Sequence, residues 1–198
     1  MKYVVMADGK GTRWNNYMNI PKHLVKVDGE TIIGRTVRLL NEYDDSAEVI
    51  VTSHDPRYEF EGATRYEPIN NVLEIDRFTY ELIENNMCFL YGDTYYTEDA
   101  IKSIVNTKTD ELLFFGNNKS IVAIKVADSA ILKNNIDKVK QLYLNGEIDN
   151  CKGWQVYQTY MNLGYDKKEI GDRFVILDNK TNDYNTPEEY ENSLGRGR

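Results

Sequence analysis

A short glycine-containing loop near the start of the chain carries the residue types that bind phosphate groups. Residues 9–13 are Gly-Lys-Gly-Thr-Arg, and they follow directly on an apolar run. Glycines let the backbone approach a ligand and direct successive N–H groups at an anion. Thr12 and the forked guanidinium of Arg13 add donors that suit phosphate oxygens. The loop is neither a Walker A loop nor a complete GxGxxG motif, so by itself it predicts either a structural turn or a phosphate site.

The surrounding elements must place this loop at the end of a strand. Apolar runs predict strands over 3–6, 49–51, 87–91, 112–115 and 121–124, and helical periods fall at 32–40, 72–84, 98–105 and 129–144. Strands that are apolar on successive residues and alternate with helices favour a mostly parallel sheet between two helical layers. The runs 111–115 and 120–126 are too close for a crossover helix, so we expect an antiparallel hairpin and a mixed sheet. Such sheets bind ligands at the carboxyl ends of their strands.

Composition excludes several classes of protein. The chain has 198 residues, 41% of them hydrophobic, which suits one domain over 1–192 with a flexible tail over 193–198. Lys and Arg number 24 against 32 Asp and Glu, a net charge of −8, which is the wrong sign for a nucleic-acid binder. Cys88 and Cys151 form no disulfide or zinc motif, and no apolar run suggests a signal peptide or membrane span. We therefore expect a cytoplasmic protein without nucleic-acid or membrane partners.

The residues after the loop make the phosphate interpretation specific. Residues 21–33 are Pro-Lys-His-Leu-Val-Lys-Val-Asp-Gly-Glu-Thr-Ile-Ile. Together with the loop, this pattern resembles the signature of the nucleoside-triphosphate transferases that make nucleotide-sugars and related activated alcohols, including choline-phosphate cytidylyltransferases and molybdopterin guanylyltransferases (MobA-like proteins). The resemblance implies a Rossmann-like, GT-A-type α/β fold. It departs from the family at Asp8, where a small residue is usual, so this side chain is expected to face away from phosphate or to bond a base, a ribose or a loop amide.

The resemblance also implies roles for individual residues. Arg13 and Lys22 are expected to hold the triphosphate and, with Asp93, to carry the catalysis. The nucleotide-binding set that the resemblance implies is Ala7, Asp8, Gly9, Lys10, Gly11, Thr12, Arg13 and Lys22. A phosphate monoester attacks the α-phosphorus of the NTP, and pyrophosphate leaves. Because the attacking group is already anionic near neutral pH, the protein must mainly position two anions and stabilise their charge.

A nucleotidyltransferase of this kind needs a divalent cation, and the resemblance assigns its ligands. Asp93 follows the apolar run 87–91 and matches the metal-binding aspartate of the family, while Asn185 matches the second ligand position, with Asp183 as the alternative. Mg²⁺ is expected, because it takes one or two protein oxygens besides phosphate and water. Each residue also has a structural interpretation: Asp93 can cap a turn, and residues 185–188 form a good helix start.

The acceptor site is the least determined part of the sequence. Trp154 and Tyr157 share a helical face with Tyr160 and Met161, in the region where the family gathers acceptor contacts, and core packing explains the same spacing. The stretch 70–78 lies where the resemblance implies contacts to the base or ribose; Val72, Ile75 and Phe78 are expected to face the core, and the polar remainder forms either a solvated face or part of that site. His23 occupies a variable position of the motif, and His54 is expected in a loop.

The sequence thus predicts an Mg²⁺-dependent nucleotidyltransferase that moves an NMP, with CMP the first choice, to a sugar phosphate or phosphoalcohol and releases pyrophosphate. A homo-oligomer is compatible with this interpretation. Two alternatives stay open. One is a nucleotide-sugar-dependent glycosyltransferase of the same fold, although residues 92–94 lack the second aspartate of a DxD motif. The other is a non-catalytic nucleotide-binding relative.

Overall fold

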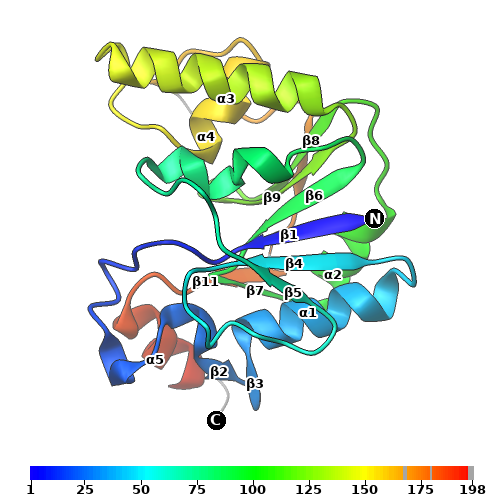
Figure 1. Ribbon diagram of the computed structural model, residues 1–198, viewed down its shortest axis with the longest axis vertical. Helices are drawn as coiled ribbons and strands as arrows, with labels where there is room; N and C mark the ends of the chain where they lie inside the picture. The colour runs from blue at the N-terminus through cyan, green and yellow to red at the C-terminus, as the bar shows by residue number, and fades with distance from the viewer. Residues whose placement is uncertain (167–168, 179, 196–198) are drawn as a thin grey trace.

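The protein is built around one seven-stranded sheet with helices on both faces (Figure 1). A computed structural model describes residues 1–166, 169–178 and 180–195. The strand order is β10-β8-β9-β6-β1-β4-β5. These strands are β1 (Lys2–Met6), β4 (Glu48–Thr52), β5 (Thr64–Tyr66), β6 (Met87–Tyr91), β8 (Leu112–Gly116), β9 (Ile121–Val126) and β10 (Phe174–Ile176). All neighbours pair in parallel except β9, which is antiparallel to both β6 and β8. The mixed, mostly parallel sheet confirms the predicted fold class.

Most of the predicted elements are present within one to four residues of their expected bounds. The helices α1 (Ile32–Tyr43), α2 (Glu98–Asn106) and α3 (Ser129–Leu144) follow the apolar periodicity of the sequence. The predicted hairpin is β8–β9. Its connection is too short for a crossover, so the second strand must run antiparallel to the first.

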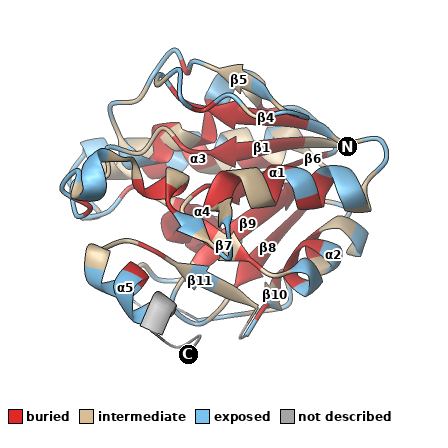
Figure 2. Ribbon diagram, turned by 90° about the horizontal axis from the view of Figure 1, so that it is seen from below, coloured by how far each residue is buried: buried red, intermediate tan, exposed pale blue. Residues whose placement is uncertain are grey.

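The sheet separates two hydrophobic cores. Along β1, Tyr3 and Val5 pack with α1 and α2, whereas Val4 and Met6 pack with α3 and α4 (Gly153–Tyr160) on the opposite face. This alternation follows from the period of two in a strand, and it explains why every residue of the run is apolar. Figure 2 shows the buried strands between the more exposed helices.

The structure corrects the prediction of one helix over the segment 72–84. This segment forms two short 3-10 turns, η3 (Glu74–Phe78) and η4 (Tyr80–Leu82), separated by Thr79 at a φ of 44°. The left-handed backbone at Thr79 prevents a continuous helix. Ile75 and Phe78 are buried as expected, but Val72 is 73% exposed, because it precedes the turn and shares no helical face with them.

Smaller elements complete the fold beside the sheet. Two short antiparallel pairs form, β2 (Lys26–Val27) with β3 (Glu30–Thr31) and β7 (Thr94–Tyr96) with β11 (Thr181–Asp183). The last helix, α5 (Pro187–Gly195), includes residues 193–195 of the expected tail, and residues 196–198 lie outside the described part. Both cysteines are buried free thiols. No helix in the described ranges has the length and apolar character needed to cross a bilayer.

Candidate active site

The loops that follow the parallel strands β1, β4 and β6 lie together at one edge of the sheet. Met6, the last residue of β1, pairs in register with Thr52 and with Tyr91, which end the neighbouring strands. Residues 7–13, 53–58 and 92–93 therefore meet at this edge. Two adjacent cavities open here, and we call them the loop cavity and the strand-end cavity.

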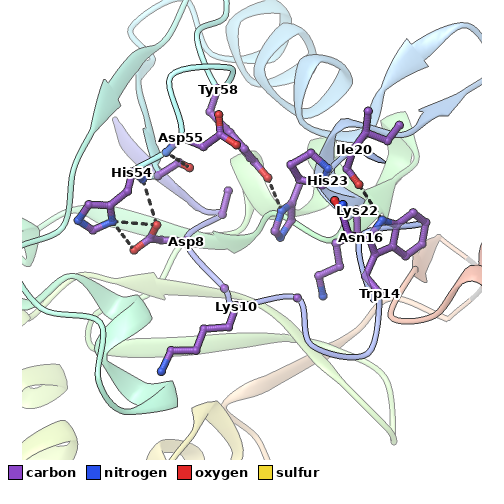
Figure 3. Close-up of a pocket in the computed structure, with 15 residues that line it drawn as sticks. Asp8, Lys10, Trp14, Asn16, Ile20, Lys22, His23, His54, Asp55 and Tyr58 are labelled. Carbon is purple, nitrogen blue, oxygen red and sulfur yellow. Dashed lines mark hydrogen bonds and ion pairs between the residues drawn. The ribbon is translucent and has the colours of Figure 1, made fainter. Parts of the chain in front are cut away.

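The loop cavity has a volume of about 310 Å³ and is formed by the glycine-containing loop, the segment 20–23 and the loop after β4 (Figure 3). It is lined by Ala7, Asp8, Gly9, Lys10, Gly11, Trp14, Asn16, Ile20, Pro21, Lys22, His23, Ser53, His54, Asp55 and Tyr58. Six of the eight residues predicted to bind nucleotide are in this set. Of the other two, Thr12 is exposed and lines neither cavity, and Arg13 lines the strand-end cavity.

Asp8 is held by groups that neutralise and orient its carboxylate. The backbone N–H of His54 donates to Oδ1 at 3.0 Å, the Nδ1 of His54 donates to Oδ2 at 2.9 Å, and the Nδ2 of Asn71 donates to Oδ2 at 2.7 Å. The hydrogen bond to Asp8 raises the pKa of His54. One predicted role, a hydrogen bond to a loop amide, is thus present, and the pairing explains how an acidic residue is accommodated beside an anion site.

The strand-end cavity, of about 280 Å³, lies on the other side of the same loop. Its lining is Arg13, Glu74, Arg77, Tyr91, Asp93, Thr94, Lys119, Ser120, Ile121, Lys152, Gly153, Trp154, Asp183 and Asn185. Both basic and acidic residues belong to this lining. The cavity collects the predicted residues Arg13, Asp93, Asn185 and Trp154 from four separate segments of the chain.

An ion pair between Lys22 and Asp93 joins the two cavities. Lys22 lines the loop cavity, Asp93 lines the strand-end cavity, and the Nζ of Lys22 donates to Oδ2 of Asp93. Burial opposes ionisation of Asp93 and is the largest single effect on it, but the charge and hydrogen bond of Lys22, together with the charges of His23 and Arg77, outweigh it, so the pKa of Asp93 lies below its usual value. Both predicted catalytic groups are therefore present as ions at the junction of the cavities.

Arg13 and Asn185 meet across the mouth of the strand-end cavity. An Nη of Arg13 donates to the amide oxygen of Asn185 at 2.8 Å, across 172 positions of sequence. The residues after Asn185 form a capping box, in which Thr186 Oγ1 accepts from the Glu189 N–H and the Glu189 carboxylate accepts from the Thr186 N–H. The predicted helix start is confirmed, and it fixes Asn185 opposite the glycine-containing loop.

The acidic groups of this cavity suit a hard divalent cation. Asp183 lies beside Asp93 and accepts a 2.9 Å hydrogen bond from Thr94 Oγ1. Burial raises the pKa of Asp183, and the charge of Asp93 adds to the effect, so a bound cation would relieve this repulsion. Within 1–166, 169–178 and 180–195, no group of three or more His, Cys, Asp and Glu could hold a metal ion. Mg²⁺ needs fewer protein oxygens than that, and Asp93 with Asp183 or Asn185 can supply them.

The two residues proposed for acceptor contact separate in the structure. Trp154 lines the strand-end cavity. Tyr157 does not, because it is fully buried in the core, where its ring packs on Phe114 and its hydroxyl accepts from the Gly171 N–H. For Tyr157 the core-packing interpretation is the correct one.

Sequence reasoning singled out none of several polar residues at this edge, among them Arg77, Tyr91 and His54. Arg77 and Tyr91 line the strand-end cavity, and His54 lines the loop cavity. The sequence places Tyr91 only in a buried strand, and it places Arg77 in a stretch with two interpretations, a solvated face or a contact to the base or ribose. The position of Tyr91 as the last residue before Gly-Asp was the one available signal, because side chains at strand ends face ligand sites.

Comparison with known proteins supports the fold. No family model matches the chain, and no curated protein matches it in sequence. Among solved structures, CTP:phosphocholine cytidylyltransferase from Streptococcus pneumoniae aligns over 100% of this chain and 99% of its own, with a TM-score of 0.58 and 16% identity. A Bacillus anthracis protein assigned as a glucose-1-phosphate thymidylyltransferase aligns over 100% of this chain and 95% of its own, with a TM-score of 0.65 and 15% identity. The inositol-1-phosphate CTP transferase from T. maritima aligns over 98% of this chain and 93% of its own, with a TM-score of 0.58 and 11% identity. The chain therefore has the nucleotidyltransferase fold over nearly its full length.

Proposed function

We propose that the protein is a cytoplasmic, Mg²⁺-dependent nucleotidyltransferase that transfers an NMP from an NTP to a phosphorylated small molecule. The observation that carries this proposal is the ion pair of Lys22 with Asp93 between two adjacent cavities at the carboxyl edge of the sheet, with Arg13 in the lining of the strand-end cavity. The two cavities offer room for two substrates. The cations between them lie where two anionic groups must approach one another.

In the proposed reaction, the loop cavity takes the NTP and the strand-end cavity takes the acceptor. An oxygen of the acceptor phosphate bonds to the α-phosphorus, the bond from that phosphorus to the bridging β-oxygen breaks, and pyrophosphate leaves with the electron pair. The loop N–H groups, Arg13 and Lys22 bind and orient the phosphates. Mg²⁺, held by Asp93 with Asp183 or Asn185, would neutralise phosphate charge when bound. No general base is needed, since the attacking oxygen is already anionic.

CTP is the proposed donor. It is the nucleotide in the names of two of the compared proteins. We would incubate the purified chain with Mg²⁺, each of the four NTPs and a panel of phosphorylated acceptors, and measure pyrophosphate release. We expect release that depends on both an NTP and an acceptor. Binding of NTP without release for any acceptor would instead identify a non-catalytic relative, and transfer from a nucleotide-sugar would identify a glycosyltransferase.

The metal assignment has a separate test. Asp93→Ala should lower kcat/KM at least tenfold, because a metal ligand contributes several kcal/mol to transition-state stabilisation. Asp149→Ala, an exposed loop aspartate outside both cavities, is the matched control and should be within twofold of the unmodified protein. A smaller loss for Asp93→Ala would remove Asp93 from the catalytic set.

A further inference from the structure

Arg77 lies at the wall between the two cavities. It lines the strand-end cavity, and its guanidinium carbon lies 3.3 Å from where a Cβ on Gly9 would be. Gly9 belongs to the loop cavity, so the absence of a side chain there admits the guanidinium. The ion pair of Arg77 with Glu74 is long, at 3.7 Å, which leaves the planar fork available for a phosphate group.

The turn that carries Arg77 is anchored to the helical layer. Asp76 is buried, and its Oδ2 accepts from the N–H groups of Val72 and Leu73 at 3.0 and 2.7 Å. Its Oδ1 pairs with Lys140 of α3 at 2.7 Å. Arg77 is thus presented by a turn that is fixed on both sides, and not by a free surface segment.

The hydroxyl of Tyr91 occupies a space that Gly153 leaves open in the same cavity. A Cβ on residue 153 would overlap the Tyr91 Oη. Burial raises the pKa of Tyr91, so its hydroxyl stays neutral and can both donate and accept. The Glu74 carboxylate lines the cavity as well. These two groups are suited to hydrogen bonds with the hydroxyls of a ligand.

The indole ring of Trp154, one of the two aromatic residues in this lining, is closed to a cationic ligand. The ring of Trp154 stacks on Phe174, with centroids 5.8 Å apart, and meets Tyr157 edge-on at 5.9 Å. Its indole N–H donates to the Lys119 carbonyl at 3.1 Å, and 6% of the residue is exposed. Recognition of a quaternary ammonium depends on open aromatic faces, and Trp154 does not offer one.

We infer that the acceptor is the phosphate monoester of a hydroxyl-rich compound, a sugar or a polyol, with Arg77 binding its phosphate and Tyr91 and Glu74 binding its hydroxyls. This inference rests on the proposed transfer reaction. It selects among phosphorylated acceptors by the chemistry of the cavity: polar hydrogen-bonding groups are present, and of the two aromatic residues in the described lining, Trp154 has no open ring face.

The direct test compares three acceptors. The purified full chain with Mg²⁺ and the NTP that it uses best is assayed with glucose 1-phosphate, ribitol 5-phosphate and phosphocholine. We expect kcat/KM for the better of the first two to exceed that for phosphocholine by about a hundredfold, since polar groups left unpaired by the wrong ligand penalise it strongly. The first two arms distinguish a sugar from a polyol. Equal or better use of phosphocholine would overturn the inference.

Failure of the proposed function is distinguishable from failure of this inference. If no NTP supports pyrophosphate release, the same three compounds are titrated into the full chain by calorimetry. Glucose 1-phosphate or ribitol 5-phosphate should then bind at least about tenfold more tightly than phosphocholine. Absence of this preference overturns the inference whether or not transfer occurs.

Two variants test the assigned residues. Tyr91→Phe should raise KM for the hydroxylated acceptor about fivefold, the effect of one neutral hydrogen bond, and leave KM for the NTP within twofold; Tyr80→Phe on η4 is its control. Arg77→Gln should lower kcat/KM about a hundredfold, with partial recovery in Arg77→Lys, whereas Arg38→Gln on α1 should change it less than twofold. Loss of less than threefold in Arg77→Gln, or an unchanged acceptor KM in Tyr91→Phe, contradicts the assignment.

Discussion

Lys22 and Asp93 are 71 positions apart in the chain, yet each depends on the other for a counter-charge. Their side chains are 9% and 16% exposed, so removal of one leaves the other charge in a poorly solvated site. The pair has two roles in the proposed reaction, because Lys22 faces the phosphates and Asp93 faces the metal. Stability and activity are therefore coupled at this position.

Lys22→Met should lower the free energy of unfolding by about 3 kcal/mol, because it leaves the Asp93 carboxylate unpaired. Urea denaturation measures this change. Lys26→Met, at an exposed position of β2, is the control and should be within about 0.5 kcal/mol of the unmodified protein. The double variant with Asp93→Asn should recover part of the stability and none of the activity. A loss below about 1 kcal/mol would show that the pair is solvated.

His23 should make stability depend on pH. It is buried in the loop cavity wall, its Nδ1 lies 2.8 Å from the Tyr58 hydroxyl, and burial lowers its pKa to about 4. Because its unfolded pKa is near 6.5, the unfolded chain binds the proton more readily between pH 6.5 and 4. The contribution of His23 to the free energy of unfolding is fully present above pH 6.5. It decreases by up to about 3 kcal/mol as the pH drops toward 4.

His23→Gln should therefore flatten the decline of unfolding free energy between pH 6.5 and 4, as measured by urea denaturation at a series of pH values. His54→Gln is a matched control. Asp8 raises the pKa of His54, so His54 contributes stability at low pH that is lost as the pH rises, and its removal cannot flatten the acid decline. An unchanged profile in His23→Gln would mean that other groups cause it.

At the scale of elements, the turn η3 shows how the hydrogen bonds of one buried carboxylate can stabilise a turn where a helix was predicted. Asp76 accepts hydrogen bonds from two N–H groups before the turn and pairs with Lys140 of α3. Local bonds of this kind compete with helical ones, and Thr79 adopts a left-handed conformation directly after η3. The result is a compact turn that directs Arg77 toward the loop after β1.

Lys140→Met should destabilise the protein by about 3 kcal/mol, since Asp76 then has no counter-charge in a buried site. It should also speed hydrogen exchange of the amides of residues 72–78 more than those of α3, because the anchor of the turn is lost. Lys138→Met, on the exposed face of the same helix, should have neither effect. Uniform exchange changes across both elements would indicate global destabilisation without a local anchor.

At the scale of the whole molecule, a net charge of −8 has to be reconciled with two anionic substrates. The surface as a whole repels polyanions, so NTP affinity must come from a few placed groups, the loop amides, Arg13 and Lys22, together with the metal. In the described structure the two side chains are already engaged, by Asn185 and Asp93. In the proposed reaction, the cation would therefore be the main source of new attraction for the NTP.

Chelation of divalent ions should weaken CTP binding at least tenfold. Isothermal titration of CTP in Mg²⁺ and in EDTA, at constant ionic strength and without acceptor, measures this dependence. CMP, with a single phosphate, serves as the control and should depend less on the ion. Equal CTP affinity with and without Mg²⁺ would show that the protein's own cations suffice.

The sequence by itself determined the order and type of most elements, the hairpin and the place of the glycine-containing loop at the end of the first strand. These features depend on local spacing: strands repeat every two residues, helices every 3.6, and turns depend on a few adjacent side chains. The loop, Lys22, Asp93 and Asn185 could be selected because each belongs to a short motif. The helix predicted over 72–84 was wrong because the ion pair of Asp76 with Lys140 and the left-handed backbone at Thr79 override the apolar period.

Only the tertiary structure decided which of these residues meet. The pairs Lys22–Asp93 and Arg13–Asn185 arise from closing the chain across 71 and 172 positions. Burial of Tyr157, exposure of Val72 and the position of Arg77 over Gly9 likewise depend on how the helical layers pack on the sheet. Such contacts carry no local periodicity, because they result from the packing of both cores together. For that reason the residues that we propose to distinguish one acceptor from another became visible only in the folded chain.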